Sequence, residues 1–233
     1  MKILTFAPYG RFSNEAGLIH LFGRYISGKS TVTNLIDNGV FSVSDRDEEV
    51  GWRRKVSTCA EWTWEQIQMA QWAGVNIQEL SACIMPNFLN DSSEGLVEEA
   101  KETFSRRYGA FDSNHRGHQQ FARRLNGSVI RLKAGLDRYL SQNRPDLVLC
   151  AGGHDFQSRT MLGVCASLRV PSSLFSFSFE HRGIRVLSSE KKEFLSCALV
   201  VPDVREFRSD IDSWSPEVKE ILGEIAQFLG VVV

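Results

Sequence analysis

The sequence lacks the features that would direct it to a membrane, a secretory route or nucleic acid. It has no run of about 18 or more apolar residues, and its opening stretch MKILTFAPYG is too short an apolar segment for a signal peptide. Its net charge is only -1, without the strongly basic footprint of most nucleic-acid-binding chains. We therefore expect a cytoplasmic protein with no nucleic-acid partner, for which peripheral contact at the inner face of the membrane is the closest approach to lipid.

The sequence also lacks paired cysteines. No C-x-x-C pair occurs, and an odd number of cysteines in a cytoplasmic chain suits neither a disulfide framework nor a zinc site. We interpret the five cysteines as small apolar residues of the core: Cys59, Cys83, Cys150, Cys165 and Cys197. No metal site and no protein-bound cofactor is expected.

What is present is an ordinary globular composition. Of the 233 residues 42% are hydrophobic and 24% are charged, which is enough to bury a substantial core. No internal repeat or low-complexity tract interrupts the chain. We expect one domain over residues 1–233, with a core that extends to about residue 203 and a C-terminal linker and helix over residues 204–233.

Strands alternate with helices along most of the sequence. We expect strands at residues 2–7, 31–36, 147–151, 172–180 and 198–201. We expect helices at residues 13–27, 62–73, 115–143, 156–168 and 216–229, with a further charged helix through 98–107 that Asp91 or Ser92 caps. This alternation favours βαβ units, and thus an α/β fold with a Rossmann-like open, mainly parallel sheet and helices on both faces.

Ligands of an open parallel sheet bind beyond the carboxyl ends of its strands, where loops and helix N-termini converge. Three polar segments follow expected strands in this way: residues 8–14, 152–159 and 180–183. The first segment contains Gly10 and Asn14, and either Ser13 or Asn14 is available as the N-cap of the next helix. The rim of the sheet is therefore the expected ligand site.

The second segment, residues 152–159, places two glycines, a histidine and an aspartate between a buried strand and a helix start. His154 is a candidate general base with Asp155 beside it. In the alternative interpretation the two glycines form a tight turn and Asp155 caps the helix. Both interpretations remain open.

The third segment, residues 180–183, places three ionisable residues directly after the apolar run SLFSFSF. Arg182 could hold a phosphate or carboxylate, and Glu180 could contact a sugar hydroxyl. In the alternative interpretation the segment is a salt-bridged hairpin corner, in which Gly183 makes the turn.

Residues 23–30 match the phosphate-loop pattern G-x-x-x-x-G-K-[ST] in full, at Gly23, Gly28, Lys29 and Ser30. That chemistry needs a strand before the loop and a helix after it. Here the preceding segment is better interpreted as a helix and the following TVTNLI as a strand. A nucleotide-binding phosphate-loop protein is therefore an alternative to a helix–turn–strand connection.

The remaining histidines lie on expected helices. His20 is more simply structural, although its place near the loop after the first strand keeps it as a candidate. His115 and His118 are close to Arg116, Arg123 and Arg124 in the sequence. This cluster is most simply a solvated helix face, and contact with an anionic partner is the alternative.

Two stretches resemble a known family. KILTFAPYG with the following GLIHLFGRYISGKSTVTNLIDNG, and the later RPDLVLCAGGHDFQSRTMLGVCASLRVPSSLFSFSFEHRG, resemble the N-terminal domain of GT-B-fold glycosyltransferases of bacterial surface-polysaccharide synthesis. The resemblance implies transfer of a sugar from a nucleotide-sugar co-substrate, without an obligatory metal, to a carbohydrate or lipid-linked acceptor. It also implies that the acceptor cleft is lined by Gly10, His20, His154, Arg159, Glu180 and Arg182.

The family pattern departs from this sequence in one respect. A complete GT-B enzyme has a second Rossmann-like domain that binds the donor nucleotide, and 233 residues leave no room for it. The resemblance therefore implies a donor-binding domain on a further part of the chain or on another subunit. A non-catalytic interaction module is the remaining alternative, suggested by this missing domain and by the expected exposure of residues 52–55.

Overall fold

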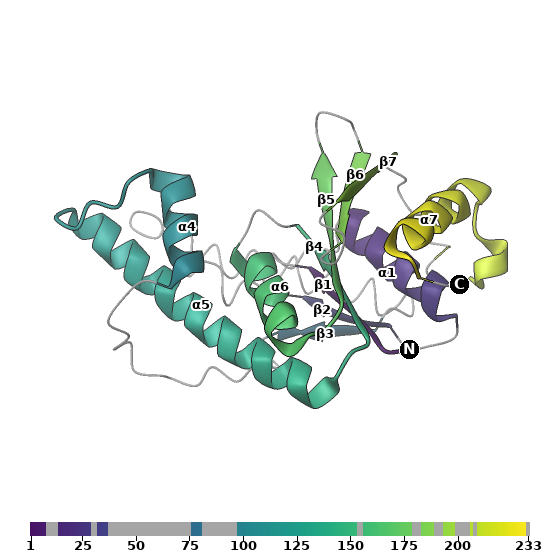
Figure 1. The fold of residues 1–233 in the computed structure, drawn as a ribbon, viewed down its shortest axis with the longest axis horizontal. Helices are drawn as coiled ribbons and strands as arrows, with labels where there is room; N and C mark the ends of the chain where they lie inside the picture. The colour runs from purple at the N-terminus through teal and green to yellow at the C-terminus, as the bar shows by residue number, and fades with distance from the viewer. Residues whose placement is uncertain are drawn as a thin grey trace.

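A computed structural model describes residues 1–7, 14–28, 32–36, 76–80, 97–152, 156–178, 183–188, 193–198, 206 and 209–231. Seven strands of these ranges form one mixed sheet in the order β3-β2-β1-β4-β5-β6-β7 (Figure 1). Helices pack against this sheet, so the predicted α/β class is confirmed.

The sheet is largely parallel. Its parallel strands are β1 (Ile3–Ala7), β2 (Val32–Ile36), β3 (Ile77–Glu79), β4 (Leu147–Ala151) and β5 (Ser172–Ser178). Two antiparallel strands extend it, β6 (Gly183–Ser188) and β7 (Phe194–Ala198). Strands β1 and β4 are buried along their whole length, as expected for apolar runs at the centre of a sheet that is covered on both faces.

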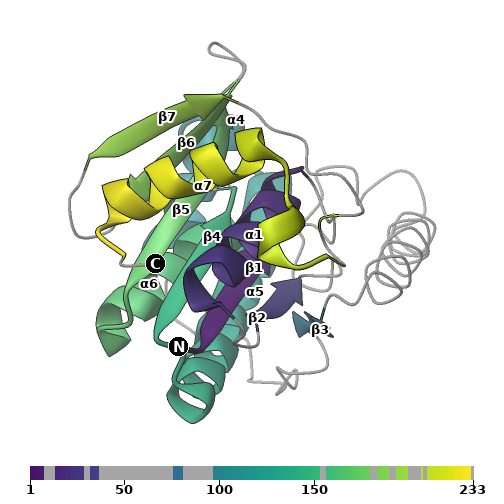
Figure 2. The ribbon, with the colours of Figure 1, turned by 90° about the vertical axis from the view of Figure 1, so that its right-hand side faces the viewer.

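Helices cover both faces of the sheet. On one face lie α1 (Asn14–Ser27) and α7 (Pro216–Leu229), and on the other lie α5 (Arg116–Asn143) and α6 (Phe156–Leu168), with α4 (Glu98–Tyr108) beside them (Figure 2). Successive strand residues point to opposite faces, so Ile3 joins the core under α1 and α7 whereas Leu4 joins the core under α5 and α6.

Local signals at the helix ends explain why several predicted boundaries are confirmed. Helix α7 begins after Ser215, whose side chain accepts a hydrogen bond from the Val218 N–H, and ends at Gly230 with φ 69°. Helix α5 begins after His115, whose ring Nδ1 accepts a hydrogen bond from the His118 N–H at 3.2 Å. The expected bounds of β4 and α6 also agree with the structure.

Other predictions are wrong. Helix α4 begins after Val97, whose side chain makes no capping bond, so neither Asp91 nor Ser92 caps it. Strands β3 and β6 were not predicted, and β7 ends at Ala198, where the sequence predicts the last strand to start. The predicted helix over residues 62–73 lies outside the described residues.

Two predictions about apolar residues can be compared with the described ranges. Cys150, Cys165 and Cys197 are buried and free, as predicted, and Cys59 and Cys83 lie outside these ranges. None of the helices described here is both long and apolar enough to span a bilayer.

Candidate functional site

The order of the strands reverses between β1 and β4. From β1 the chain passes through α1 to β2 on one side, and from β4 it passes through α6 to β5 on the other side. Helix α1 follows β1 and helix α6 follows β4, and the two helices lie on opposite faces of the sheet (Figure 2). Such a reversal is where open α/β sheets bind ligands, beyond the carboxyl ends of the strands.

The topology brings the three predicted segments to this same edge. Strands β1, β4 and β5 are adjacent and parallel, so the connections that leave their carboxyl ends start side by side. Seven candidate residues in or near these connections and in the phosphate-loop match lie outside the described residues: Gly10, Lys29, Ser30, His154, Asp155, Glu180 and Arg182. Asn14 is the first residue of α1.

The two ends of the 152–155 connection are held firmly. Gly152 has φ 104°, a conformation that favours glycine, and its N–H donates to the carbonyl of Phe175 on β5 at 2.9 Å. Ser158, in the first turn of α6, donates from its hydroxyl back to the carbonyl of Ala151 at 2.8 Å. The connection that contains His154 therefore starts and ends at backbone positions that the sheet determines.

The connection between β5 and β6 is the corner of a β-hairpin. Strands β5 and β6 pair in antiparallel register, with Ser178 opposite Gly183. This pairing agrees with a hairpin at residues 180–183, although Gly183 belongs to the strand and not to the turn. The expected salt bridge falls on residues outside the described ones. The pairing places Glu180 and Arg182 in the connection between two paired strands at the same edge.

His20 lies inside the fold. Its side chain is 4% exposed, and its Nδ1 lies 3.0 Å from Nδ2 of Asn34 on β2. The Asn34 amide also donates to the carbonyl of Asn76 at 2.9 Å, and its Oδ1 accepts from the Thr5 hydroxyl at 2.7 Å. This network joins α1 to β1, β2 and the residue before β3. His20 Nδ1 lies within hydrogen-bond distance of both Asn34 Nδ2, at 3.0 Å, and Asn34 Oδ1, at 3.1 Å, so the tautomer of the imidazole determines which of the two bonds forms.

Burial determines the charge of His20. Desolvation, with a smaller effect of the positive charge of Arg24, lowers the pKa of His20 from 6.5 to about 4, although the bond to Asn34 acts in the opposite direction. The imidazole is therefore uncharged at neutral pH. Sequence reasoning missed Thr5 and Asn34, and the signal available for them was the presence of polar residues within the apolar runs ILTFA and VTNLI.

Arg159 connects two helices. Its guanidinium forms an ion pair with Glu102 on α4, donates to the Thr103 hydroxyl at 2.6 Å, and approaches the carbonyl of Glu99 at 3.4 Å. The Arg159 side chain is 15% exposed. The sequence placed Arg159 in the acceptor cleft, whereas in the structure its guanidinium is engaged by α4.

The phosphate-loop match has the wrong order of elements for phosphate binding. Gly23 lies within α1, where an added Cβ would be 3.1 Å from Val32 Cγ1, and Gly28 with φ 63° follows the end of that helix. The chain therefore runs from helix to strand, and the end of a helix presents carbonyl groups that repel a phosphate. Arg24, within the motif, donates to the carbonyls of Glu206 and Ser209.

A cavity of about 770 Å³ lies at the opposite, amino-terminal edge of the sheet. It is lined by the start of β1, by Gln78, and by the end of α5, where the Tyr139 hydroxyl donates to Gln78 Oε1 at 2.8 Å. Lys2 and Asp146 also line it, and the Asp146 N–H donates to the Lys2 carbonyl at 2.8 Å. Among the described residues that line it there is no histidine and no cysteine.

The described residues contain no group of three or more histidine, cysteine, aspartate or glutamate side chains that could hold a metal ion. No protein-family model matches the chain. No curated protein matches it either.

Proposed function

We propose that this chain is a Rossmann-like domain that forms the acceptor-binding half of a GT-B-like glycosyltransferase. The observation that carries the proposal is that three polar segments leave the carboxyl ends of β1, β4 and β5, next to the point where the strand order reverses. The resemblance of the surrounding sequence to GT-B N-terminal domains supports a sugar acceptor as the ligand.

In this proposal the acceptor hydroxyl attacks the anomeric carbon of a nucleotide-sugar while a basic side chain removes its proton. The bond from that carbon to the phosphate oxygen breaks, and the nucleotide leaves on the donor-binding domain. His154 or Glu180 takes that proton, and Asp155 orients His154. Arg182 holds a phosphate or carboxylate of the acceptor by charge-assisted hydrogen bonds. Gly10, before α1, allows the acceptor to approach the backbone closely.

Two of the residues that the resemblance assigns to the acceptor cleft have a different role in this proposal. His20 is an uncharged, buried residue of α1, so we assign it to holding α1 on β2 through Asn34. Arg159 is engaged by Glu102 and Thr103, so we assign it to holding α6 on α4. Both are positioning residues of the proposed site, because each fixes a helix that starts at the edge where the acceptor binds.

The donor nucleotide binds to a separate domain in this proposal, either on a further part of the chain or on another subunit. The two halves meet over the carboxyl edge of the sheet, so that edge forms one wall of the catalytic cleft. We place the reaction in the cytoplasm, where nucleotide-sugars are the donors for surface-polysaccharide synthesis.

The test is complementation in the native host, which supplies the donor-binding half. The gene is deleted, variants of the chain are returned, and the surface polysaccharide is quantified after immunoblotting shows equal protein amounts. Either His154 or Glu180 is the catalytic base in this proposal. We expect the variant that removes the base, His154→Gln or Glu180→Gln, to lower the amount of surface polysaccharide by about 100-fold or more. Arg182→Gln is expected to weaken acceptor use.

Matched controls remove the same charges elsewhere. Glu193→Gln, before β7, and Arg138→Gln, on the exposed side of α5, are expected to restore the wild-type amount of polysaccharide. If the deletion leaves the surface polysaccharide unchanged, glycosyl transfer is refuted. If the deletion abolishes the polysaccharide but His154→Gln, Glu180→Gln and Arg182→Gln all restore it, the assignment of the site is refuted.

A further inference from the structure

The cavity at the amino-terminal edge of the sheet is separate from the proposed acceptor site. Its volume of about 770 Å³ lies within the range of about 300 to 1,000 Å³ that is typical of small-molecule sites. Its walls come from the start of β1, from β2 and β3, and from the end of α5. The proposed acceptor site lies at the carboxyl edge of the same sheet, so a ligand in this cavity would leave it open.

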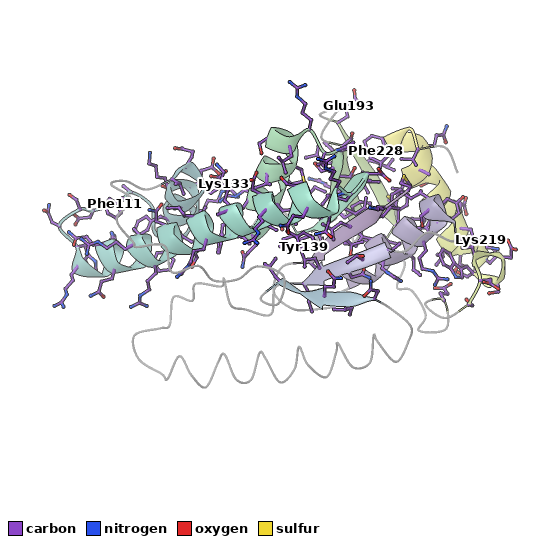
Figure 3. All side chains as sticks on the ribbon, turned by 90° about the horizontal axis from the view of Figure 1, so that it is seen from below. Phe111, Lys133, Tyr139, Glu193, Lys219 and Phe228 are labelled. Carbon is purple, nitrogen blue, oxygen red and sulfur yellow. The ribbon has the colours of Figure 1, made fainter. Side chains whose placement is uncertain are left out.

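Uncharged polar side chains from three elements line the cavity. Tyr139 of α5 is 9% exposed, and its hydroxyl donates to Oε1 of Gln78 on β3 at 2.8 Å. Figure 3 shows Tyr139 where α5 lies along the sheet, whereas Lys133 of the same helix lies farther from the strands. Thr33 of β2 and Asn143 of α5 complete this set.

The strand register explains why residues of β2 and β3 reach the same cavity. Thr33 pairs with Leu4 of β1, and Gln78 pairs with Leu35 of β2. Both leucines belong to the core under α5, so Thr33 and Gln78 share that face of the sheet. Hydroxyl and amide groups both donate and accept hydrogen bonds, and they therefore suit a ligand that is rich in hydroxyl groups.

The charged side chains that line the cavity are two cations and one carboxylate. Lys2 and Arg144 are exposed, and neither forms an ion pair with an acidic side chain that the structure describes. The Asp146 carboxylate accepts a hydrogen bond from the backbone N–H of Lys2 at 2.6 Å, so part of its charge is already compensated. The balance of these side chains is positive and favours an anionic group.

The end of α5 does not reverse this preference. Carbonyl groups at the carboxyl end of a helix together carry about half a negative charge. Two of them already accept hydrogen bonds here: the Leu140 carbonyl from the Arg144 N–H at 2.8 Å, and the Tyr139 carbonyl from Asn143 Nδ2 at 2.9 Å. The full positive charge of Arg144 follows at the same helix end, so the positive charge dominates.

We propose that this cavity binds a sugar phosphate. Lys2 and Arg144 hold the phosphate by charge-assisted hydrogen bonds, and Thr33, Gln78 and Asn143 contact hydroxyl groups of the sugar. This class of ligand combines the two properties of the lining, because it joins a hydroxyl-rich body to an anionic group. The inference does not depend on the proposed glycosyl transfer.

The experiment is isothermal titration calorimetry of the full chain with hexose phosphates. The probes are glucose 1-phosphate, glucose 6-phosphate, mannose 6-phosphate and fructose 6-phosphate, and the comparison ligands are the three neutral sugars and inorganic phosphate. We expect at least one hexose phosphate to bind about 100-fold more tightly than its neutral sugar and than inorganic phosphate. Absence of binding by all four hexose phosphates would overturn the proposal, as would equal binding of the neutral sugar or of inorganic phosphate.

Arg144→Gly tests the phosphate contact, and Arg169→Gly is its matched control. Both arginines follow the end of a helix in the left-handed conformation, with φ 43° and φ 55°, and Arg169 does not line the cavity. Glycine adopts this conformation without strain, so both variants should unfold within about 3 °C of the wild type. Arg144→Gly should weaken hexose phosphate binding by about tenfold or more, and Arg169→Gly by less than about threefold.

Two further pairs of variants test the other contacts. Lys2→Gln should weaken hexose phosphate binding by about tenfold, whereas Lys133→Gln, on the exposed side of α5, should leave it unchanged. Thr33→Val should weaken it by about fivefold, whereas Thr5→Val removes a hydroxyl that does not line the cavity and should leave it unchanged. Equal loss within either pair would contradict the assignment of the site.

Arg182→Gln separates this site from the proposed acceptor site. We expect it to bind the hexose phosphate like the wild type, because residue 182 belongs to the connection at the opposite edge of the sheet. Loss of binding in Arg182→Gln without loss in Arg144→Gly would place the hexose phosphate at the carboxyl edge, and it would overturn this inference while leaving the proposed function in place.

Discussion

Acidification is expected to destabilise this protein through His20. The pKa of this histidine is about 4 in the folded chain, compared with 6.5 when it is solvated. Above pH 6.5 the imidazole is neutral in both states, and its contribution to stability is fully present. As the pH falls, the unfolded chain takes up a proton that the folded chain does not, so stability is lost until the pH reaches about 4.

The size of the effect follows from the two pKa values. Their separation corresponds to about 3 kcal/mol of unfolding free energy, of which about 2 kcal/mol is lost between pH 7 and pH 5. That is a large share of the total stability of a typical domain, about 5 to 15 kcal/mol. The loss of unfolding free energy between pH 7 and pH 5 should therefore be measurable in addition to the effects of the other titrating groups.

The assay compares urea unfolding of the wild type and of His20→Gln at pH 7, 6 and 5, followed by circular dichroism. The variant should be the less stable protein at pH 7, because it loses the bond to Asn34 and part of the packing under α1. Other titrating groups contribute equally to both proteins and cancel in the difference. We expect that difference to decrease by about 2 kcal/mol between pH 7 and pH 5.

Thr5→Val is the matched control. It removes the hydroxyl that donates to Asn34 Oδ1 but leaves the imidazole in place, so it should be destabilised by about 1 kcal/mol and should retain the pH dependence of the wild type. A difference between wild type and His20→Gln that stays constant from pH 7 to pH 5 would refute the reasoning, because it would mean that His20 is not held neutral by burial.

Three further predictions concern other parts of the fold. Gly23→Ala should destabilise the protein by about 1 to 3 kcal/mol in thermal unfolding, because the added Cβ would lie 3.1 to 3.3 Å from side chains of β1 and β2. Gly163→Ala is the control: no atom lies within 4 Å of its added Cβ, so it should be neutral or stabilising by up to about 1 kcal/mol. A double-mutant cycle of Arg159→Met and Glu102→Gln should show a coupling of about 1 kcal/mol, and additive effects would contradict the ion pair between α6 and α4. Lys29→Ala should leave calorimetric titrations with Mg-ATP and Mg-GTP unchanged, and nucleotide binding that this substitution abolishes would restore the phosphate-loop interpretation.

Elements with strong local signals could be predicted from the sequence. Strand β4 is an apolar run between Pro145 and Gly152, and α6 and α7 carry helical spacing of apolar residues between clear start and stop signals. The short strand β3 and the mixed sequence of β6 carry no such signal. They are strands because neighbouring strands offer them hydrogen-bond partners, with β6 antiparallel to β5.

The location of the candidate site was predictable, but the environment of its residues was not. The segments at the rim follow from where apolar strands end, which is visible in the sequence. The partners of His20 and Arg159 are not, since Asn34 is 14 residues from His20 and Glu102 is 57 residues from Arg159. Such contacts depend on how α1 lies on β2 and how α6 lies on α4.

The sequence by itself determined the α/β class, most helix boundaries and the segments that end at the rim, because these follow from the local spacing of apolar residues and of glycine, proline and capping residues. Only the tertiary structure decided the strand order, the direction of β6 and β7, the neutral state of His20 and the engagement of Arg159. The physical reason is that pairing, burial and charge neutralisation depend on which groups meet in space, and residues far apart in the chain supply those groups.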